Sequence, residues 1–481
     1  MHQFEKSEGA YVENSIFWEL LFERELTSRS RIRLLELDNA DGIFVMYDST
    51  LEDKKEQVIL TKFNLDGESV WKIAISNEFW NNSITVDDFN GDNYADFILL
   101  SGVNRSSYDT VVTLIFLIDG KTGKLTSRTL PSWSFHPWFL LSDRLVDIKN
   151  SKRKGIIHLE MNTDARLISL ASAKLLWEKK LLSEQEYKEV VPFDIIPSPS
   201  HPVVCKMRKQ QLLYITFEPY IWCLDANQGI TIWSNREGNF KFTGEPIFLE
   251  HLDDSLSLII SSGILSEDIF GYKKIAIYAY NALKGTIAWK QYLGEYFSNE
   301  TPIIKPSHYN NIPLLIVAIK GGNDVFLIES KIGQIISKQR LPFLVHTFSV
   351  DKKIDCDVSP DVVFLGKAKR TFRDEQEFEA GVFIYSIVEQ PLKRKLVAKD
   401  GKYELIPDYL KTPEDIHRQL HESYIPWLVL KNYFSFEDAF RSGYSKDIDG
   451  DGAMEVVMLS PPSAKGQKLH ALRIIPITKK Y

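Results

Sequence analysis

Cysteine is scarce in this chain of 481 residues, which contains only Cys205, Cys223 and Cys356. Three cysteines do not make the disulfide framework of a small secreted domain, and no CxxC pair indicates a zinc site. Cys205 and Cys223 could form a bridge, but two buried thiols are the favoured interpretation. Stability must therefore come from an apolar core, for which 44% apolar residues are ample.

Long apolar runs and an excess of positive charge are also missing. No run approaches the roughly 20 apolar residues of a membrane helix, and the longest, 111–118 and 312–319, have the length of strands. A net charge of −7 argues against a nucleic-acid partner, because such a surface usually shows clustered Lys and Arg. Short basic runs such as 152–154 are interpreted as solvated turns. The N-terminal residues lack the basic start and apolar core of a signal peptide.

Internal repeats are the main feature that is present. Each repeat has an apolar strand, a tight turn and a second strand that often carries Trp. The turn glycine recurs at intervals of 56, 50, 56, 56 and 48 residues, which is the length of four short strands with their turns. The markers of these intervals are Gly67, Gly123, Ala173 in place of glycine, Gly229, Gly285 and Gly333.

Four-stranded units repeated radially form a β-propeller. We therefore predict an all-β fold, a single β-propeller over residues 1–481, with eight blades and seven as the alternative. Blades one to seven are assigned to residues 34–401 and the last blade to 441–481. The isolated strand at 12–26 is predicted to pair with the last blade and close the ring, because an open ring would leave sheet edges exposed.

Residues 402–440 depart from the repeat and are interpreted as an insertion. Thr412 is typical of a helix N-cap and Pro413 of a first helical turn, so a short helix is expected there. Insertions in repeat proteins usually lie on one face, which is often the binding face.

Two acidic loops with similar spacing each precede an apolar strand, one at 88–96 and one at 447–455. Alternate side chains in a tight loop can direct their oxygens toward one point, and calcium takes roughly six to eight oxygen ligands. The Ala453 carbonyl could fill a gap in the second loop. Neither loop is an EF-hand, because apolar β-branched strands follow instead of helices. The acids of the second loop are Asp447, Asp449, Asp451 and Glu455.

The acidic loops resemble FG-GAP repeats, as in the integrin alpha-chain propeller, where such loops bind calcium between the first two strands of a blade. Residues 225–233 and 281–289 resemble the quinoprotein-type (PQQ-like) propeller repeat, with its Asp-Ala-x-x-Gly-x-x-x-Trp pattern. The resemblance implies two Ca²⁺ sites but no quinone chemistry, because the cofactor-binding set of those enzymes is not identifiable here. The first implied ligand set is Asp88, Asn90, Asp92, the Tyr94 carbonyl and Asp96; the second is the set of acids listed above. A degraded third loop at 355–361 is not expected to hold an ion.

No Ser/His/Asp order, phosphate loop or thiolate nucleophile stands out. We therefore expect a calcium-stabilised binding or scaffold module without catalysis, for a protein or glycan partner, as a monomer or as a subunit of a complex. Millimolar calcium outside the cell favours an extracytoplasmic location with the leader missing from this sequence, and a cytoplasmic scaffold is the open alternative. The alternative function is an extracytoplasmic enzyme on the same scaffold, either a calcium-dependent polysaccharide lyase or a quinone-dependent dehydrogenase.

Overall fold

The computed structural model is almost entirely β-structure in the part of the chain that it describes. One helix, α1 (Glu184–Val190), lies in that part. The chain divides into two compact units, here called the first unit (residues 18–298 and 462–469) and the second unit (residues 1–17, 299–461 and 470–481). The described residues are 15–23, 32–35, 42–50, 56–64, 66–75, 84–104, 111–130, 139–149, 151, 153–160, 164–190, 200–207, 210–238, 240–250, 257–267, 271–297, 301–309, 312–351, 361–372, 375–391, 394–399, 402–407, 424–436, 442–446, 454–459 and 466–474.

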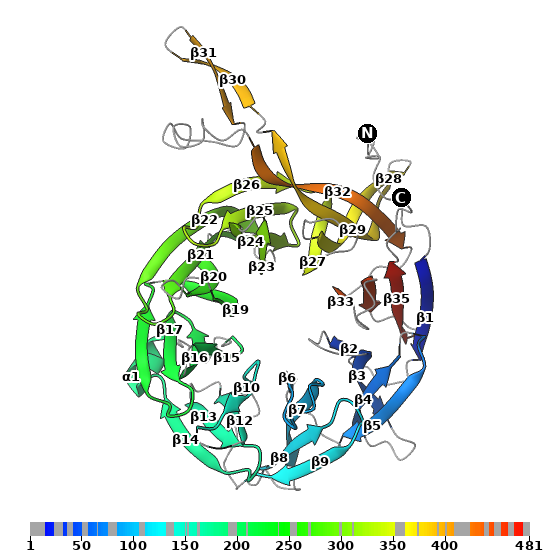
Figure 1. Ribbon diagram of the computed structural model, residues 1–481, viewed down its shortest axis with the longest axis vertical. Coiled ribbons are helices and arrows are strands. Elements are labelled where there is room, and N and C mark those ends of the chain that lie inside the picture. The colour runs from blue at the N-terminus through cyan, green and yellow to red at the C-terminus, as the bar shows by residue number, and fades with distance from the viewer. Residues whose placement is uncertain are drawn as a thin grey trace. The chain divides into compact units, whose positions relative to one another are not determined.

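The first unit contains five antiparallel sheets that follow one another in chain order, and Figure 1 shows them side by side along an arc. The first sheet contains β2 (Ile32–Leu35), β3 (Ile43–Thr50), β4 (Glu56–Phe63) and β5 (Ser69–Ile75). The second contains β6 (Ile84–Asp87), β7 (Asp96–Asn104), β8 (Val111–Ile118) and β9 (Leu125–Thr129). The third contains β10 (Phe139–Leu141), β11 (Val146–Asp147), β12 (Lys154–Glu160), β13 (Asp164–Ser169) and β14 (Leu175–Lys180). The fourth contains β15 (Val203–Met207), β16 (Gln210–Phe217), β17 (Tyr220–Asp225) and β18 (Thr231–Arg236). The fifth contains β19 (Lys241–Leu249), β20 (Leu258–Glu267), β21 (Tyr272–Asn281) and β22 (Ile287–Phe297).

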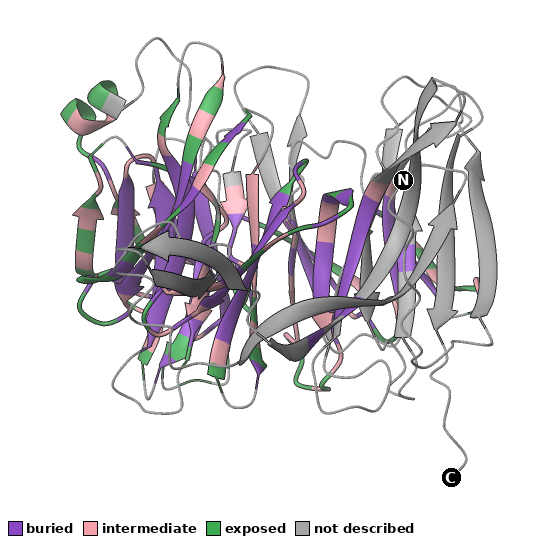
Figure 2. Cartoon of the chain, turned by 90° about the horizontal axis from the view of Figure 1, so that it is seen from above, coloured by how far each residue is buried: buried purple, intermediate pink, exposed green. Residues whose placement is uncertain are grey.

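The second, third and fourth sheets each bury both faces, which explains the continuous apolar runs in their middle strands. Successive side chains of a strand point to opposite faces. Along β16, Leu213 and Ile215 pack into a cluster with the third sheet, whereas Leu212 and Tyr214 pack into a cluster with the fifth. Figure 2 shows the buried positions concentrated along the strands. The alternation of apolar residues therefore stacks one sheet on the next.

Tryptophan side chains join neighbouring sheets at their outer strands. The indole Nε1 of Trp177 donates to the Ala226 carbonyl at 3.0 Å, and that of Trp233 donates to the Ala282 carbonyl at 2.9 Å. A Cβ added to the turn glycine of the next sheet would lie 2.7 Å from the Trp177 ring at Gly229. The turn glycines that mark the repeat all have positive φ, so glycine meets both the backbone and the packing requirement.

At one place in this unit the pair of Trp and turn glycine is absent, and both residues of the pair differ there. Ser127 stands four residues after Gly123, where the other copies of this unit carry Trp, and the next turn has Ala173 in place of glycine. Ala173 keeps the positive φ, at 53°. Without an indole in the Ser127 position, the turn has room for a methyl group.

The second unit contains two further four-stranded antiparallel arrangements. They are joined in one sheet by a single parallel pair, Lys320 with Val345, and they share one apolar cluster. The first arrangement contains β23 (Thr301–Tyr309), β24 (Ile312–Lys320), β25 (Asp324–Glu329) and β26 (Ile335–Arg340). The second contains β27 (Phe343–Asp351), β28 (Asp361–Phe372), β29 (Glu375–Pro391) and β32 (Tyr424–Phe436).

The insertion differs from the helical segment predicted at 402–440. Its regular part is a hairpin of β30 (Arg394–Lys399) and β31 (Lys402–Pro407). Residues 424–436 do not belong to it, because β32 pairs with β29 over its whole length. Aromatic and β-branched residues dominate β32 and favour a strand. The helix predicted around Thr412 lies outside the described residues.

One more sheet contains strands from both ends of the chain, in the order β1 (Ser15–Glu23), β35 (Gly466–Ile474), β34 (Met454–Leu459) and β33 (Ser442–Lys446). The pairing of β1 with β35 is the pairing expected for the strand at 12–26. The fold class is thus all-β, made of repeated four-stranded antiparallel sheets of the β-propeller type. The number of blades and the closure of a ring stay predictions.

The open question of a Cys205–Cys223 bridge is resolved by strand order. Both thiols are free and buried. They lie on β15 and β17, which flank β16, so two strand spacings of roughly 10 Å in total separate them. That separation exceeds the span of a disulfide.

Candidate metal-binding loop

The first acidic loop connects β6 to β7 in the second sheet. Asp87 and Asp96 face each other in the ladder, and the residues between them form a tight loop. Gly91 and Asn93 have positive φ values of 84° and 66°, which lets the backbone curl. Both residue types tolerate the left-handed region, so the sequence dictates the curl locally.

Three carboxylates of this loop converge. One oxygen from each of Asp88, Asp92 and Asp96 lies within 4.8 Å of the others. Asp88 also holds the loop backbone, because its Oδ1 accepts the Gly91 N–H at 2.5 Å and its Oδ2 accepts the Asn93 N–H at 2.9 Å. The structure therefore brings together all three acids that the sequence assigned to this site.

Asp96 is the buried end of the loop. Its side chain is fully buried, and its two oxygens accept the Phe89 N–H at 3.1 Å and the Gly120 N–H at 2.9 Å. Burial raises the pKa of the Asp96 carboxyl from 3.8 to about 6, the nearby charges of Asp119 and Asp92 act in the same direction, and the two backbone donors lower it. A neighbouring cation would relieve this repulsion.

The other two predicted ligands, Asn90 and Tyr94, lie in the same loop. Asn90 Oδ1 accepts the Asp92 N–H at 2.9 Å, and its amide donates to Asp119 Oδ2 at 3.3 Å. The Tyr94 ring is covered by the Lys121 ammonium, 4.4 Å from its centroid. Sequence reasoning missed Asp119. A usable signal was its place in the turn of the repeat, because the β8–β9 turn lies beside the β6–β7 loop.

The donor set fits a calcium ion. Calcium–oxygen distances are roughly 2.3–2.6 Å, so ligand oxygens around one ion lie up to about 5 Å apart. Each carboxylate oxygen has two lone pairs and can accept a backbone N–H while facing a cation. The oxygens of Asp88, Asp92 and Asp96 meet the distance condition. An ion on this site stays a proposal.

The second predicted site lies almost wholly outside the described residues, which exclude Asp447, Asp449, Asp451 and Ala453. The backbone of Glu455 belongs to β34 and pairs with Lys446. The degraded third loop at 355–361 also lies outside the described residues, except for Asp361, the first residue of β28.

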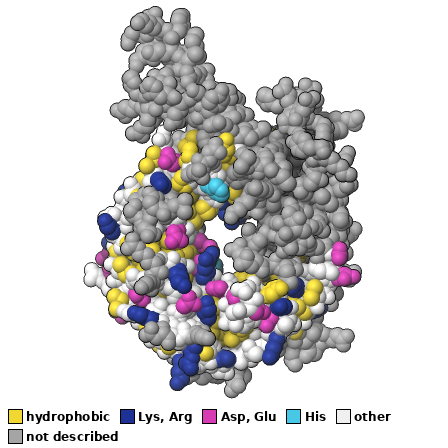
Figure 3. Space-filling model, in the orientation of Figure 1, with side chains coloured by type: hydrophobic (Ala, Val, Ile, Leu, Met, Phe, Trp, Pro, Cys, Tyr) yellow, Lys and Arg dark blue, Asp and Glu magenta, His cyan; other side chains and the backbone are white. Residues whose placement is uncertain are grey.

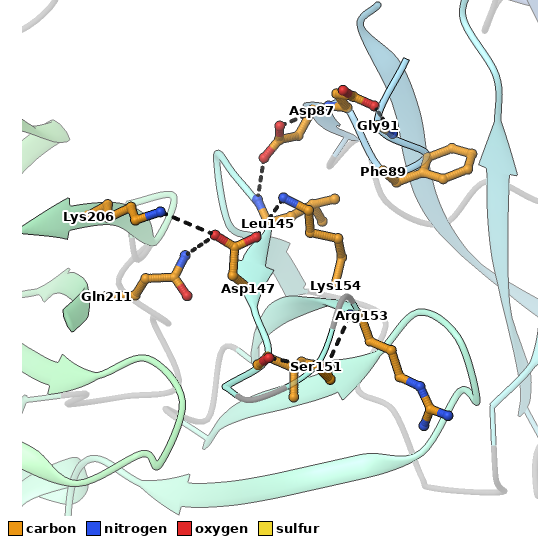
Figure 4. Close-up of polar contacts among 12 residues, drawn as sticks. Asp87, Phe89, Gly91, Leu145, Asp147, Ser151, Arg153, Lys154, Lys206 and Gln211 are labelled. Atoms are coloured by element: carbon orange, nitrogen blue, oxygen red, sulfur yellow. Dashed lines mark hydrogen bonds and ion pairs between the residues drawn. The ribbon is translucent and has the colours of Figure 1, made fainter. Parts of the chain in front are cut away.

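Polar links between sheets lie beside the metal-binding loop. Asp87 Oδ2 accepts the Leu145 N–H of the third sheet at 2.8 Å (Figure 4). In the same way, Asp143 Oδ1 accepts the Val204 N–H of the fourth sheet at 2.8 Å. Burial raises the pKa of Asp143 from 3.8 to about 6, against the lowering effect of the Val204 N–H. No sequence signal distinguished these two acids from ordinary loop residues.

Among the described residues, no helix has the length and apolar character needed to cross a membrane.

No protein-family model and no curated protein sequence matches the chain. Similar solved structures include the C-terminal WD40 domain of Sif2 (11% identity, 92% of this chain and 99% of that chain, TM-score 0.46). Others are rhamnogalacturonan lyase YesW (12%, 99% and 76%, TM-score 0.48) and the quinohemoprotein alcohol dehydrogenase from Comamonas testosteroni (9%, 84% and 76%, TM-score 0.37). Likenesses at this level carry no argument about what the chain binds or does.

Proposed function

We propose that this protein is a calcium-stabilised β-propeller that acts as a binding or scaffold module for a protein or glycan partner, without catalysis. The observation that carries the proposal is the convergence of Asp88, Asp92 and Asp96 within 4.8 Å in a loop between two strands of one sheet. An ion at such a site would stabilise the loop, because its carboxylate ligands also accept hydrogen bonds from backbone N–H groups.

In this proposal the loop is of the FG-GAP type. Asp88, Asp92 and Asp96 would hold the ion, with Asn90 and the Tyr94 carbonyl as further oxygen donors. Asp96 would transmit the stabilisation, because it also accepts the Gly120 N–H of the neighbouring turn. When bound, calcium neutralises a set of carboxylates that otherwise repel one another.

A rigid stack of sheets that presents loops at its ends suits a binding role. Loops positioned by a rigid scaffold commonly carry recognition. An extracytoplasmic location belongs to the same proposal, because calcium outside the cell would keep such sites occupied.

Calcium titration tests the proposal. We expect the full chain to bind calcium and to unfold at a higher temperature with calcium than with a chelator, since a ligand at 100 times its Kd stabilises by about 2.7 kcal/mol. Asp88→Asn with Asp92→Asn should remove one of two equivalents in calorimetry and reduce the shift in Tm.

Asp66→Asn is the matched control, because Asp66 is an exposed turn residue of the first sheet outside the loop. It should leave both the stoichiometry and the shift in Tm unchanged. A wild-type chain whose Tm and calorimetric signal ignore calcium would refute the calcium part of the proposal.

A further inference from the structure

The loops at one end of the second, third and fourth sheets separate their charged side chains by sign. In an antiparallel meander the first and third connections lie at the same end. In the loop 88–95, the described loop residues 148–149, 151 and 153, and the turns 119–124, 170–174 and 225–230, every acid is half-buried. The exposed charged side chains there are all basic: Lys121, Lys124, Lys149, Arg153 and Lys174.

The separation has a local cause. The acids accept backbone N–H groups of their own turns, as Asp119 does from Thr122 at 2.8 Å and Asp225 does from Asn227 at 2.9 Å. These bonds draw the carboxylates toward the backbone. Lys and Arg have no acceptor and carry long side chains, so their charged ends extend into water.

Two lysines from neighbouring sheets flank Asp147. Lys154 Nζ lies 2.6 Å from one Asp147 oxygen, and Lys206 Nζ of the fourth sheet lies 3.9 Å from the other (Figure 4). The Lys206 side chain is 70% exposed. We call Lys149, Arg153, Lys154 and Lys206 the basic cluster: Lys154 and Lys206 pair with Asp147, and Lys149 and Arg153 are exposed on the loop before β12. Figure 3 shows Lys and Arg side chains interspersed with Asp and Glu side chains on the face that it views.

Hydrogen bonds fix the loop that carries Lys149 and Arg153 against the fourth sheet. The Lys149 N–H donates to Asn227 Oδ1 at 2.9 Å, and the Asn227 amide donates to Gln211 Oε1 at 3.3 Å. Gln211 in turn contacts Asp147 at 3.5 Å. The backbone that bears the cations is therefore ordered before any partner arrives, which reduces the entropy cost of binding.

We propose that the basic cluster binds an acidic polypeptide segment of the partner, an inference that rests on the proposed binding function. Asp147 lies between Lys154 and Lys206, and the charge of Asp87, which is outside the proposed ligand set, also acts on Lys154. These acids would repel the dense, fixed charges of a sulfated glycan or a nucleic acid. A peptide can place its carboxylates on the exposed cations and a backbone N–H on Asp147.

Fluorescence anisotropy with a labelled ten-residue oligo-glutamate peptide tests the proposal on the full chain. We expect binding that weakens as salt rises, because exposed charges are screened beyond about 8 Å at physiological ionic strength. The triple variant Lys149→Glu, Arg153→Glu and Lys206→Glu should weaken binding by about 10-fold or more, since rim charges govern electrostatic association.

The matched control reverses three exposed lysines at the opposite end of the sheets, through Lys180→Glu, Lys188→Glu and Lys274→Glu. It carries the same change in net charge and should bind within about 2-fold of wild type, because remote charges are screened. Equal losses in the two triple variants would show a net-charge effect and overturn the proposal. Tighter binding of a heparin fragment than of oligo-glutamate, lost in the first variant, would overturn it in favour of a glycan.

The calcium experiment separates this inference from the proposed function. A chain that binds calcium but shows no preference for oligo-glutamate over a neutral peptide refutes the basic cluster alone. A chain that binds oligo-glutamate but ignores calcium refutes the calcium part alone. Each triple variant should keep the Tm of wild type, so that lost binding is not lost folding.

Discussion

Aspartates at the inner strands connect neighbouring sheets through single hydrogen bonds. Asp87 accepts the Leu145 N–H and Asp143 accepts the Val204 N–H, each at 2.8 Å. A carboxylate that accepts a backbone donor forms a charge-assisted bond, which is stronger than a neutral one. Both acids look like ordinary turn residues in the sequence, because their partners are 58 and 61 residues away.

The raised pKa of Asp143 predicts a pH dependence of stability. Its folded-state pKa of about 6 exceeds the ordinary 3.8, so the folded chain holds this proton more tightly than the unfolded chain. The associated stability is fully present below about pH 3.8 and is lost as pH rises through 6.

Asp143→Asn should remove this contribution and keep the acceptor for the Val204 N–H. Urea unfolding at several pH values measures the free energy of unfolding of both proteins. Wild type should lose stability relative to the variant between pH 4 and 6.5 and run parallel to it above pH 7. Parallel curves from pH 4 to 6.5 would contradict the assignment.

The outer strand of one sheet packs against a turn of the next sheet. Trp177 and Trp233 each place an indole against the turn glycine of the next sheet and donate to a carbonyl of that turn. The exchange of Trp for Ser127 accompanies the exchange of glycine for Ala173. Packing between sheets therefore selects both residues at once.

Substitutions at the two kinds of turn should differ in cost. Gly229→Ala places a methyl group 2.7 Å from the Trp177 ring at a φ of 68°, and should destabilise the chain by about 2–4 kcal/mol through backbone strain and overpacking. Ala173→Gly relieves the same backbone strain but loses a buried methyl group, and should stay within about 1 kcal/mol of wild type.

Chemical unfolding of both variants measures the contrast. A comparable decrease in the free energy of unfolding for Gly229→Ala and Ala173→Gly would show that the indole does not limit the space at the turn. The comparison is internal, because both positions occupy the same place in the repeat.

At the scale of the whole molecule, strands from the two chain ends share one sheet, in which β1 pairs with β35. A closed ring needs such a pairing, because each open end would otherwise expose an unpaired edge. The count of eight blades and the closure of the ring rest on this sheet as predictions.

Removal of residues 1–26 should lower the Tm, because β35 then loses its partner strand. A synthetic peptide with residues 12–26, added in excess, should restore the Tm by mass action. A scrambled peptide of the same composition is the control. A truncated chain with the Tm of wild type would show that β1 contributes nothing to closure.

The sequence alone determined the repeat, the all-β class and the three acids of the first loop, because each depends on residues close together in the chain. The turn glycines and the curl of the loop at Gly91 follow from local backbone preferences. The predicted bounds of the insertion, 402–440, were wrong because β32 pairs with β29 across an intervening hairpin. Pairing at that separation leaves little trace in local patterns.

Only the tertiary structure decided which distant side chains meet. It separated Cys205 from Cys223 by one intervening strand and placed Asp119 beside the metal-binding loop. It also joined Lys154 and Lys206 around Asp147, although they lie in basic runs that look isolated in the sequence. Packing of whole sheets sets these contacts, and it depends on apolar faces along entire strands, which no short motif encodes.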